Sequence, residues 1–362
     1  MSFFSDLLIS GKLRLNTWNI NSLRQSHPLN YLFWECTLNC NFNCQHCGSN
    51  AGRKNHFTNE LTTVEIKKVF KSLAKQTDAT KIMVAITGGE PLLRPDLFEV
   101  MTFAHKLGFK WGMVTNGSLV TPSIVSKMEK SGMNTIVVSI DGIGSVHEEF
   151  RQTPGSYQKA INAVKLLTKS KVFQDVQITT TVHPKNISNL EKMYQEFVLL
   201  GITSWRLINV DPIGRAKDNK NILLNPSQLK KLLNFIQQKR SISSIDISYG
   251  CTGFLGPKYE GKVRSWLFYC SAGITTGSIL HNGDIFVCPN VPRQSNLIQG
   301  NVRHDDFYTV WKNKFSFFRD SNRTSCTNCQ KCNYWTECKG GSLHLWDFYK
   351  KQPKFCHFDY LK

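Results

Sequence analysis

The sequence has no cysteine between residues 48 and 250, although it contains 12 cysteines in 362 residues. Four lie between residues 36 and 47, and eight lie between residues 251 and 356. Cysteines that only filled a hydrophobic core would not leave a gap of this length. In a reducing cytosol, clustered thiols serve more often as metal ligands or catalytic groups than in disulfides.

Long apolar runs are also missing. No stretch of about 18 apolar residues is present, so no membrane span is expected. The N-terminal stretch MSFFSDLLISGKLRL has neither a basic segment before a long apolar one nor a small-residue cleavage site. This argues against a secretory signal and is compatible with a short amphipathic helix. We therefore expect a cytoplasmic protein.

Acidic residues are few, 26 against 45 lysines and arginines, which gives a formal net charge of +19. Thiolates that bind iron would lower this charge without reversing it. A basic surface can attract nucleic acid, a membrane or an acidic peptide. A solvated lysine-rich surface explains it equally well. Neither zinc-finger spacing nor an RNA-binding aromatic motif is present, so no nucleic-acid partner is expected.

Short apolar runs alternate with helical patterns between residues 30 and 210. The expected strands are rich in β-branched and aromatic residues and cover residues 31–36, 81–86, 109–115, 134–140, 176–182 and 204–210. Helices are expected near residues 62–76, 96–107, 121–131, 156–170 and 188–199. Such β–α repeats predict a parallel sheet with right-handed crossovers. Because six repeats fall short of the eight that close a full barrel, the predicted α/β fold is a partial, TIM-like (β/α)6 barrel.

The periodicity weakens beyond residue 246, where glycine, aromatic residues and cysteine become frequent. A segment with so thin a core is expected to depend on metal for its fold. A helix near residues 226–240 precedes it. The expected domains are an N-terminal extension (1–29), the barrel (30–215), a linker with this helix (216–245) and a loop-rich C-terminal domain (246–362).

Unusual residues follow the expected strands. Three cysteines follow the first strand, TGGEP (87–91) the second, TNG (115–117) the third and SIDG (139–142) the fourth. In parallel sheets of this kind, the chemistry lies beyond the carboxyl ends of the strands. The motifs are therefore expected to meet on one rim.

Cys40, Cys44 and Cys47 lie in one short loop, CNFNCQHC. A disulfide uses two thiols and a closed structural zinc site uses four. Three thiolates hold a [4Fe–4S] cluster and leave one iron open to a small molecule with an amine and a carboxylate. The glycines of TGGEP allow backbone to approach such a ligand, and Glu90 or nearby carbonyl groups can accept from its ammonium group.

These motifs resemble the radical S-adenosylmethionine (radical SAM) enzymes, over roughly residues 30–215. The resemblance implies a catalytic [4Fe–4S] cluster that donates one electron to S-adenosylmethionine, and a 5′-deoxyadenosyl radical that removes hydrogen from a substrate. It also implies an electron donor such as flavodoxin or ferredoxin. The matching positions are Cys40, Cys44 and Cys47 for the cluster, Gly88, Gly89, Glu90 and Pro91 for the methionine amino group, Ser139 and Arg151 for the ribose or carboxylate, and His46 beside the adenine.

Asn116 and Asp141 supply further polar groups on the same rim. Asn116 also fits a turn before glycine, and Ser139 and Asp141 fit a strand-end turn. Cys36 is expected to be a buried strand thiol, because a fourth ligand would close the site. No catalytic side chain is identified from the sequence.

The later cysteines resemble the SPASM extension of radical SAM maturases, which usually holds two auxiliary [4Fe–4S] clusters. Its pattern expects a cysteine four positions after Cys338, where this chain has Ser342. We assign Cys329, Cys332, Cys338 and Cys356 to one cluster. The other takes Cys270, Cys288 and one or two of Cys251 and Cys326, or keeps an open iron that a substrate or His344 occupies.

The resemblance implies hydrogen abstraction from a peptide or protein. Sulfatase maturases carry an aspartate where Pro289 follows Cys288, so sulfatase maturation is not expected. The segment YLFWECTLNCNFNCQHCGS looks closest to a subgroup that acts with small lipoprotein-like or peptide partners. The alternatives are a small-molecule substrate and a non-catalytic iron–sulfur electron carrier, which would need neither GGEP nor an open cluster.

Overall fold

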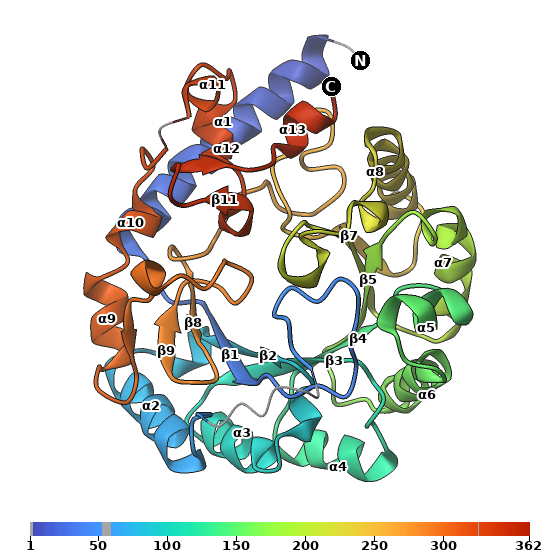
Figure 1. Ribbon diagram of the computed structural model, residues 1–362, viewed down its shortest axis with the longest axis vertical. Coiled ribbons are helices and arrows are strands. Elements are labelled where there is room, and N and C mark those ends of the chain that lie inside the picture. The colour runs from blue at the N-terminus through green and yellow to red at the C-terminus, as the bar shows by residue number, and fades with distance from the viewer. Residues whose placement is uncertain (1–2, 53–58, 325) are drawn as a thin grey trace.

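The computed structural model describes residues 3–52, 59–324 and 326–362. Its barrel follows the predicted alternation of strands and helices (Figure 1). The strands are β1 (Tyr31–Thr37), β2 (Met83–Gly88), β3 (Lys110–Thr115), β4 (Thr135–Ser139), β5 (Asp175–Val182) and β6 (Ser204–Asn209). The helices are α2 (Thr63–Gln76), α3 (Leu97–Lys106), α4 (Pro122–Lys130), α5 (Ser145–Arg151), α6 (Ser156–Lys169), α7 (Leu190–Leu199) and α8 (Pro226–Arg240).

The described sheet is larger than predicted. Its order is β10-β9-β8-β1-β2-β3-β4-β5-β6-β7, and the strands from β8 to β7 are parallel. The added strands are β7 (Asp246–Tyr249), β8 (Thr276–Ile279), β9 (Asp284–Phe286) and β10 (Gly300–Asn301). β7 and β8 lie at the two ends of the parallel series and do not pair with each other in the described residues, so the barrel is open, as expected.

Both β7 and β8 lie within the range assigned to the C-terminal domain. They have four residues each, too few to produce a recognisable strand pattern in the sequence. β7 pairs with β6 and β8 pairs with β1, so residues beyond 246 complete the sheet of the barrel. The domain boundary at residue 246 stays a prediction.

Local sequence signals explain the helix starts. The side chain of Thr62 accepts a hydrogen bond from the backbone of Glu65, which bonds back to the backbone of Thr62 and completes a capping box. Pro122 occupies the first turn of α4, where its missing N–H costs nothing. The apolar faces of these helices pack on the outer side of the sheet against buried strand residues such as Trp34 and Cys36.

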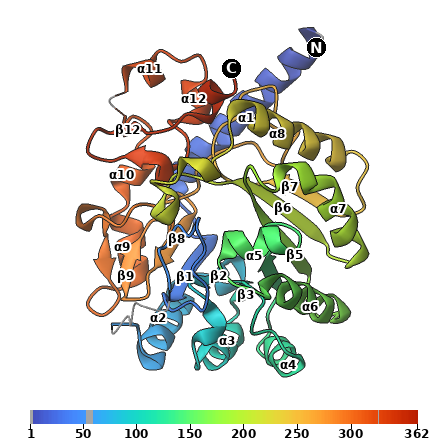
Figure 2. The ribbon, with the colours of Figure 1, turned by 45° about the vertical axis from the view of Figure 1, so that its right-hand side comes forward.

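The N-terminal helix α1 (Phe3–Ser26) is 24 residues long, so the expectation of a short helix was wrong. It runs beside the C-terminal segment, and the start of α1 lies at the same end of the molecule as the C-terminus (Figures 1 and 2). Leu13 of α1 packs with Phe254 and Phe268. No described helix combines the length and the apolar character that a membrane crossing requires.

The remaining elements are short. They are α9 (Phe307–Asn313), α10 (Ser316–Arg319), α11 (Thr327–Gln330), α12 (Trp335–Cys338), α13 (His357–Tyr360), and the antiparallel pair β11 (Trp346–Asp347) and β12 (Gln352–Pro353). This segment is loop-rich, as the sequence predicts.

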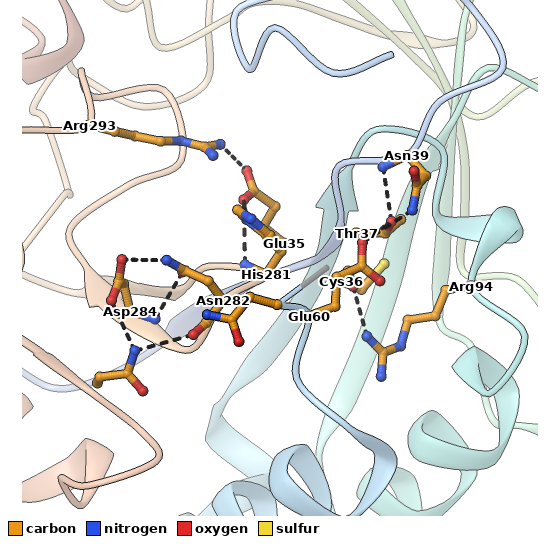
Figure 3. A network of polar contacts seen from close by, with 12 residues as sticks. Glu35, Cys36, Thr37, Asn39, Glu60, Arg94, His281, Asn282, Asp284 and Arg293 are labelled. Atoms are coloured by element: carbon orange, nitrogen blue, oxygen red, sulfur yellow. Dashed lines mark hydrogen bonds and ion pairs between the residues drawn. The ribbon is translucent and has the colours of Figure 1, made fainter. Parts of the chain in front are cut away.

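A buried carboxylate joins the barrel to the C-terminal segment. Glu35 of β1 is fully buried, and its side chain contacts Nδ1 of His281 at 2.9 Å and the guanidinium group of Arg293 (Figure 3). His281 follows β8, and Arg293 lies in the loop after Cys288. A buried carboxylate is tolerated only when it is paired. Glu35 therefore ties the loop after Cys288 to β1.

We predict that Glu35→Ala lowers the free energy of unfolding by about 1.5–3 kcal/mol, because Arg293 and His281 lose a charged hydrogen-bond partner. Urea denaturation of the reconstituted protein measures the change. Glu149→Ala is the control, since it removes only an exposed ion pair with Lys185 and should cost about 0–1 kcal/mol. Equal effects of the two substitutions would contradict the role given to Glu35.

Candidate active site

The three cysteines after β1 line a cavity of about 340 Å³ on the rim of the barrel. Cys44 is buried, and Cys40 and Cys47 are partly buried. All 12 cysteines are described, and none of them forms a disulfide. In the described residues, no three His, Cys, Asp or Glu side chains converge as they would around a single metal ion. A four-iron cluster instead takes each thiolate on a separate iron, so its ligands need not meet at one point.

The cysteine loop has little regular structure and is fixed by a segment after β6. Arg215 donates through Nε to the carbonyl group of Cys44 at 2.7 Å and through its guanidinium group to that of Ala51 at 2.8 Å. Its backbone N–H donates to the carbonyl group of Cys47. Gly214 has a φ of +53°, and a Cβ there would lie 2.3 Å from the Cys47 oxygen. Arg215 therefore fixes the loop through its backbone carbonyl groups, and Gly214 allows the close approach that this requires.

The glycines of GGEP pack closely against the residues that lead into the cysteine loop. A Cβ on Gly88 would lie 2.0 Å from the carbonyl oxygen of Thr37, and one on Gly89 would lie 2.1 Å from that of Asn39. The Gly89 N–H donates to the carbonyl group of Thr37 at 2.8 Å. Both glycines also line the cavity. They are thus required for the approach of β2 to the cysteine loop as well as for room beside a ligand.

Glu90 does not line this cavity. Its carboxylate accepts hydrogen bonds from the Thr115 hydroxyl at 2.7 Å and from the Asn116 N–H at 2.8 Å. It is fully buried, and Pro91 begins a short 3-10 helix behind it. Neither side chain lines the cavity. The geometry therefore favours an indirect role for Glu90, which orients the ends of β2 and β3.

Of the other predicted cofactor residues, four line the cavity and one does not. His46, Asn116, Ser139 and Arg151 line the cavity. Asp141 lies behind them and accepts from Nε of Arg151 at 2.7 Å. Burial would raise the pKa of Asp141, but Arg151 and the neighbouring histidines lower it to about 2. Asp141 is therefore ionised and keeps Arg151 in place.

His46 stacks on Phe150, with ring centroids 4.3 Å apart. Burial lowers the pKa of His46 to about 3, so the imidazole is neutral. A flat neutral ring on the cavity wall is compatible with the predicted position beside an adenine.

Five C-terminal cysteines line a second cavity, of about 760 Å³. They are Cys326, Cys329, Cys332, Cys338 and Cys356. The Cys326 sulfur accepts from the N–H of Cys329 at 3.4 Å. The structure thus places Cys326 beside the first predicted ligand group, and not with Cys270 and Cys288. The sequence left this open because spacing alone does not show which way the Cys326 loop folds.

Cys251, Cys270 and Cys288 form the remaining group. Burial raises the pKa of Cys288 to about 12, and the charges of Cys270 and Cys251 contribute to this rise. Cys251 also lines the 340 Å³ cavity. Ser342 donates its hydroxyl to the carbonyl group of Cys251 at 2.8 Å. Cys36, in contrast, is buried in the core as expected.

Family models match both parts of the chain. The radical SAM superfamily model matches residues 34–197, and the model of an iron–sulfur cluster-binding domain, SPASM, matches residues 270–333. This chain is a radical SAM enzyme with a SPASM domain. The loop with Cys40, Cys44 and Cys47 lies in the first matched region. The second region contains Cys270, Cys288, Cys326, Cys329 and Cys332.

Relatives of this radical SAM enzyme align over most of its length. An AdoMet-dependent heme synthase of Methanosarcina barkeri is 28% identical, and the alignment covers 88% of this chain and 94% of that protein. Mycofactocin maturase MftC of Mycobacterium tuberculosis is 28% identical, covering 86% and 78%. The solved structure of Streptococcus suis SuiB bound to S-adenosylmethionine has a TM-score of 0.71 at 18% identity, covering 91% and 76%. That likeness shows the shared fold.

We predict that Arg215→Ala speeds the loss of iron to a chelator by about 10-fold or more. The carbonyl groups of Cys44 and Ala51 lose charge-assisted hydrogen bonds, each worth about 1.5–3 kcal/mol. Absorbance of the iron–chelator complex follows the release. Lys217→Ala, at an exposed position in the same segment, is the control. Identical rates for wild type and Arg215→Ala would refute this role.

Proposed function

We propose that this radical SAM enzyme abstracts a hydrogen atom from a peptide or protein substrate. The observation that carries the proposal is one cavity whose wall combines the three cysteines of the loop, the first two residues of GGEP and groups from the C-terminal range. These residues are Cys40, Cys44, Cys47, Gly88, Gly89, Cys251 and His344. A substrate in this cavity would contact both domains. Such an arrangement suits a reaction that uses the catalytic cluster of the barrel together with groups of the C-terminal domain.

Cys40, Cys44 and Cys47 are proposed to hold the catalytic [4Fe–4S] cluster. When bound, this cluster supplies one electron that splits S-adenosylmethionine into methionine and a 5′-deoxyadenosyl radical. The protein contributes position and exclusion of water. Gly88 and Gly89 offer backbone to the amino group, while Arg151 and Ser139 offer polar contacts from α5 and β4. The external electron donor is proposed to be a flavodoxin or ferredoxin.

Two auxiliary clusters are proposed for the SPASM domain. One would use ligands from the five cysteines around the 760 Å³ cavity. The other would use Cys251, Cys270 and Cys288. Thiolates are the soft ligands that iron–sulfur clusters take, and Ser342 offers only a hydroxyl.

Several relatives support a peptide substrate. Mycofactocin maturase and the subtilosin biosynthesis protein AlbA of Bacillus subtilis match 86% and 78% of this chain. SuiB is solved with its precursor peptide SuiA, and anSMEcpe with a bound peptide. The heme synthases favour a small-molecule substrate as the second candidate. We also propose a cytoplasmic location, because clustered cysteines that serve as iron ligands rather than in disulfides suit a reducing compartment.

The test uses short peptides encoded beside the gene of this protein. The anaerobically reconstituted enzyme is incubated with each peptide, S-adenosylmethionine and dithionite, and the products are examined by mass spectrometry. A mass change in one peptide, together with 5′-deoxyadenosine, is expected. Formation of 5′-deoxyadenosine without a change in any peptide, but with oxidation of an added small molecule, would favour the second candidate instead.

We predict about 11 to 12 irons per reconstituted chain, from three four-iron clusters. Replacing Cys40, Cys44 and Cys47 together with alanine should leave about 8 irons and abolish 5′-deoxyadenosine, since the auxiliary sites share none of these ligands. Colorimetric iron analysis measures the content. Cys36→Ala, a core thiol, should change neither. A triple variant with about 4 irons would show a single auxiliary cluster and overturn the proposed count.

A further inference from the structure

A carboxylate and an imidazole meet on the wall of the 340 Å³ cavity, apart from the residues that match the cofactor motifs. Asp211 follows β6, and His344 lies in the short 3-10 helix Leu343–Leu345 of the SPASM domain. His344 Nε2 is 2.9 Å from Asp211 Oδ2, and each side chain is about one-tenth exposed. Both line the cavity with the three cysteines of the cluster loop. The pair joins the two domains at the place where a substrate would bind.

The carboxylate of this pair is held from behind. The side-chain amide of Asn209 donates to Asp211 Oδ1 at 3.0 Å. Tyr249 donates its hydroxyl to Asn209, and Thr252 donates to Tyr249 at 2.8 Å. This chain of hydrogen bonds fixes Asp211 before any substrate arrives. A preorganised carboxylate costs no reorganisation when a neighbouring group becomes charged.

The carboxylate of Asp211 determines which ring nitrogen of His344 carries the proton. In the described residues, His344 makes one side-chain hydrogen bond, through Nε2. A hydrogen bond from Nε2–H to the Asp211 carboxylate puts the ring proton on Nε2 and leaves the lone pair of Nδ1 available. His357 approaches the other oxygen of Asp211 at 3.9 Å. Asp211 also stabilises the imidazolium ion that would form if Nδ1 took up a proton.

The remaining charged groups of the cavity wall are committed elsewhere. Arg151 is paired with Asp141, and Arg215 binds the carbonyl groups of the cysteine loop. Neither guanidinium group can accept a proton. The other histidine of this wall, His46, lies inside the cluster loop and stacks on Phe150. His344 is the histidine of the wall that lies outside that loop and has a carboxylate within hydrogen-bonding distance.

We propose that His344, oriented by Asp211, accepts a proton from the substrate after hydrogen abstraction. The inference rests on the proposed peptide-modifying function. The 5′-deoxyadenosyl radical takes a hydrogen atom from carbon and leaves a carbon-centred radical beside an N–H, O–H or S–H group. That heteroatom bond then breaks, its proton passes to Nδ1 of His344, and a new bond forms to the carbon. This step also releases one electron, which an auxiliary iron–sulfur cluster held by the SPASM cysteines would accept as the one-electron oxidant.

The experiment compares two products of the same reaction. The probe is the peptide that the wild-type enzyme modifies in the mass-spectrometric test above, and the measured quantity is modified peptide per 5′-deoxyadenosine. His344→Gln keeps a donor toward Asp211 but has no basic nitrogen. Because this variant lacks a general base, the ratio should fall by about 10²- to 10⁴-fold. The amount of 5′-deoxyadenosine formed and the iron content should not change. Asp211→Asn should lower the ratio in the same direction.

Chemical rescue separates a chemical role from a structural one. His344→Ala opens space on the cavity wall, and added imidazole should restore the ratio. His304→Gln, at an exposed position, is the control and should behave as wild type. If His344→Gln loses its iron, the ratio in Asp211→Asn decides.

An unchanged ratio in His344→Gln would overturn the inference while the proposed function stands. A parallel loss of 5′-deoxyadenosine and product would also overturn it, because it indicates a structural role. If the wild-type enzyme modifies no peptide, the proposed function fails and this inference fails with it.

Discussion

The site depends on how the cysteine loop is held. The loop from Cys40 to Cys47 lacks regular structure, so its thiols are positioned by contacts from other segments. Gly88 and Gly89 allow β2 to approach the residues just before the loop, and Gly214 allows the segment after β6 to approach Cys47. Arg215 donates hydrogen bonds to the carbonyl groups of the loop. Both approaches require backbone without a Cβ. The same residues therefore shape the barrel rim and fix the cluster site.

The second constraint is that the C-terminal domain is part of this rim. β8 pairs with β1, and Glu35 of β1 binds Arg293 in the loop after Cys288. Cys251 and His344 consequently reach the wall of the same cavity as Cys40. A substrate held there would lie between the catalytic cluster and the auxiliary ligands. This placement suits the proposed reaction, in which a substrate would lose a hydrogen atom, a proton and an electron.

Much of the fold was predictable from the sequence, because the six strands and their helices carry clear hydrophobic periodicity. β7 and β8 were missed because four residues give too short a pattern. The rim motifs were predictable from the rule that they follow parallel strands. The direction of the Glu90 side chain was not, since it depends on donors from β3 and the turn after it. The contact between Asp211 and His344 spans 133 residues, and no local pattern encodes it.

The central claim is that three thiolates leave one iron free to bind S-adenosylmethionine beside Gly88 and Gly89. The most direct measurement is electron–nuclear double resonance on the reduced enzyme with S-adenosylmethionine that carries 15N in its amino group. We predict a 15N hyperfine coupling to the cluster that disappears in the protein with Cys40, Cys44 and Cys47 replaced by alanine. A reduced wild-type cluster with bound S-adenosylmethionine and no 15N coupling would contradict the account.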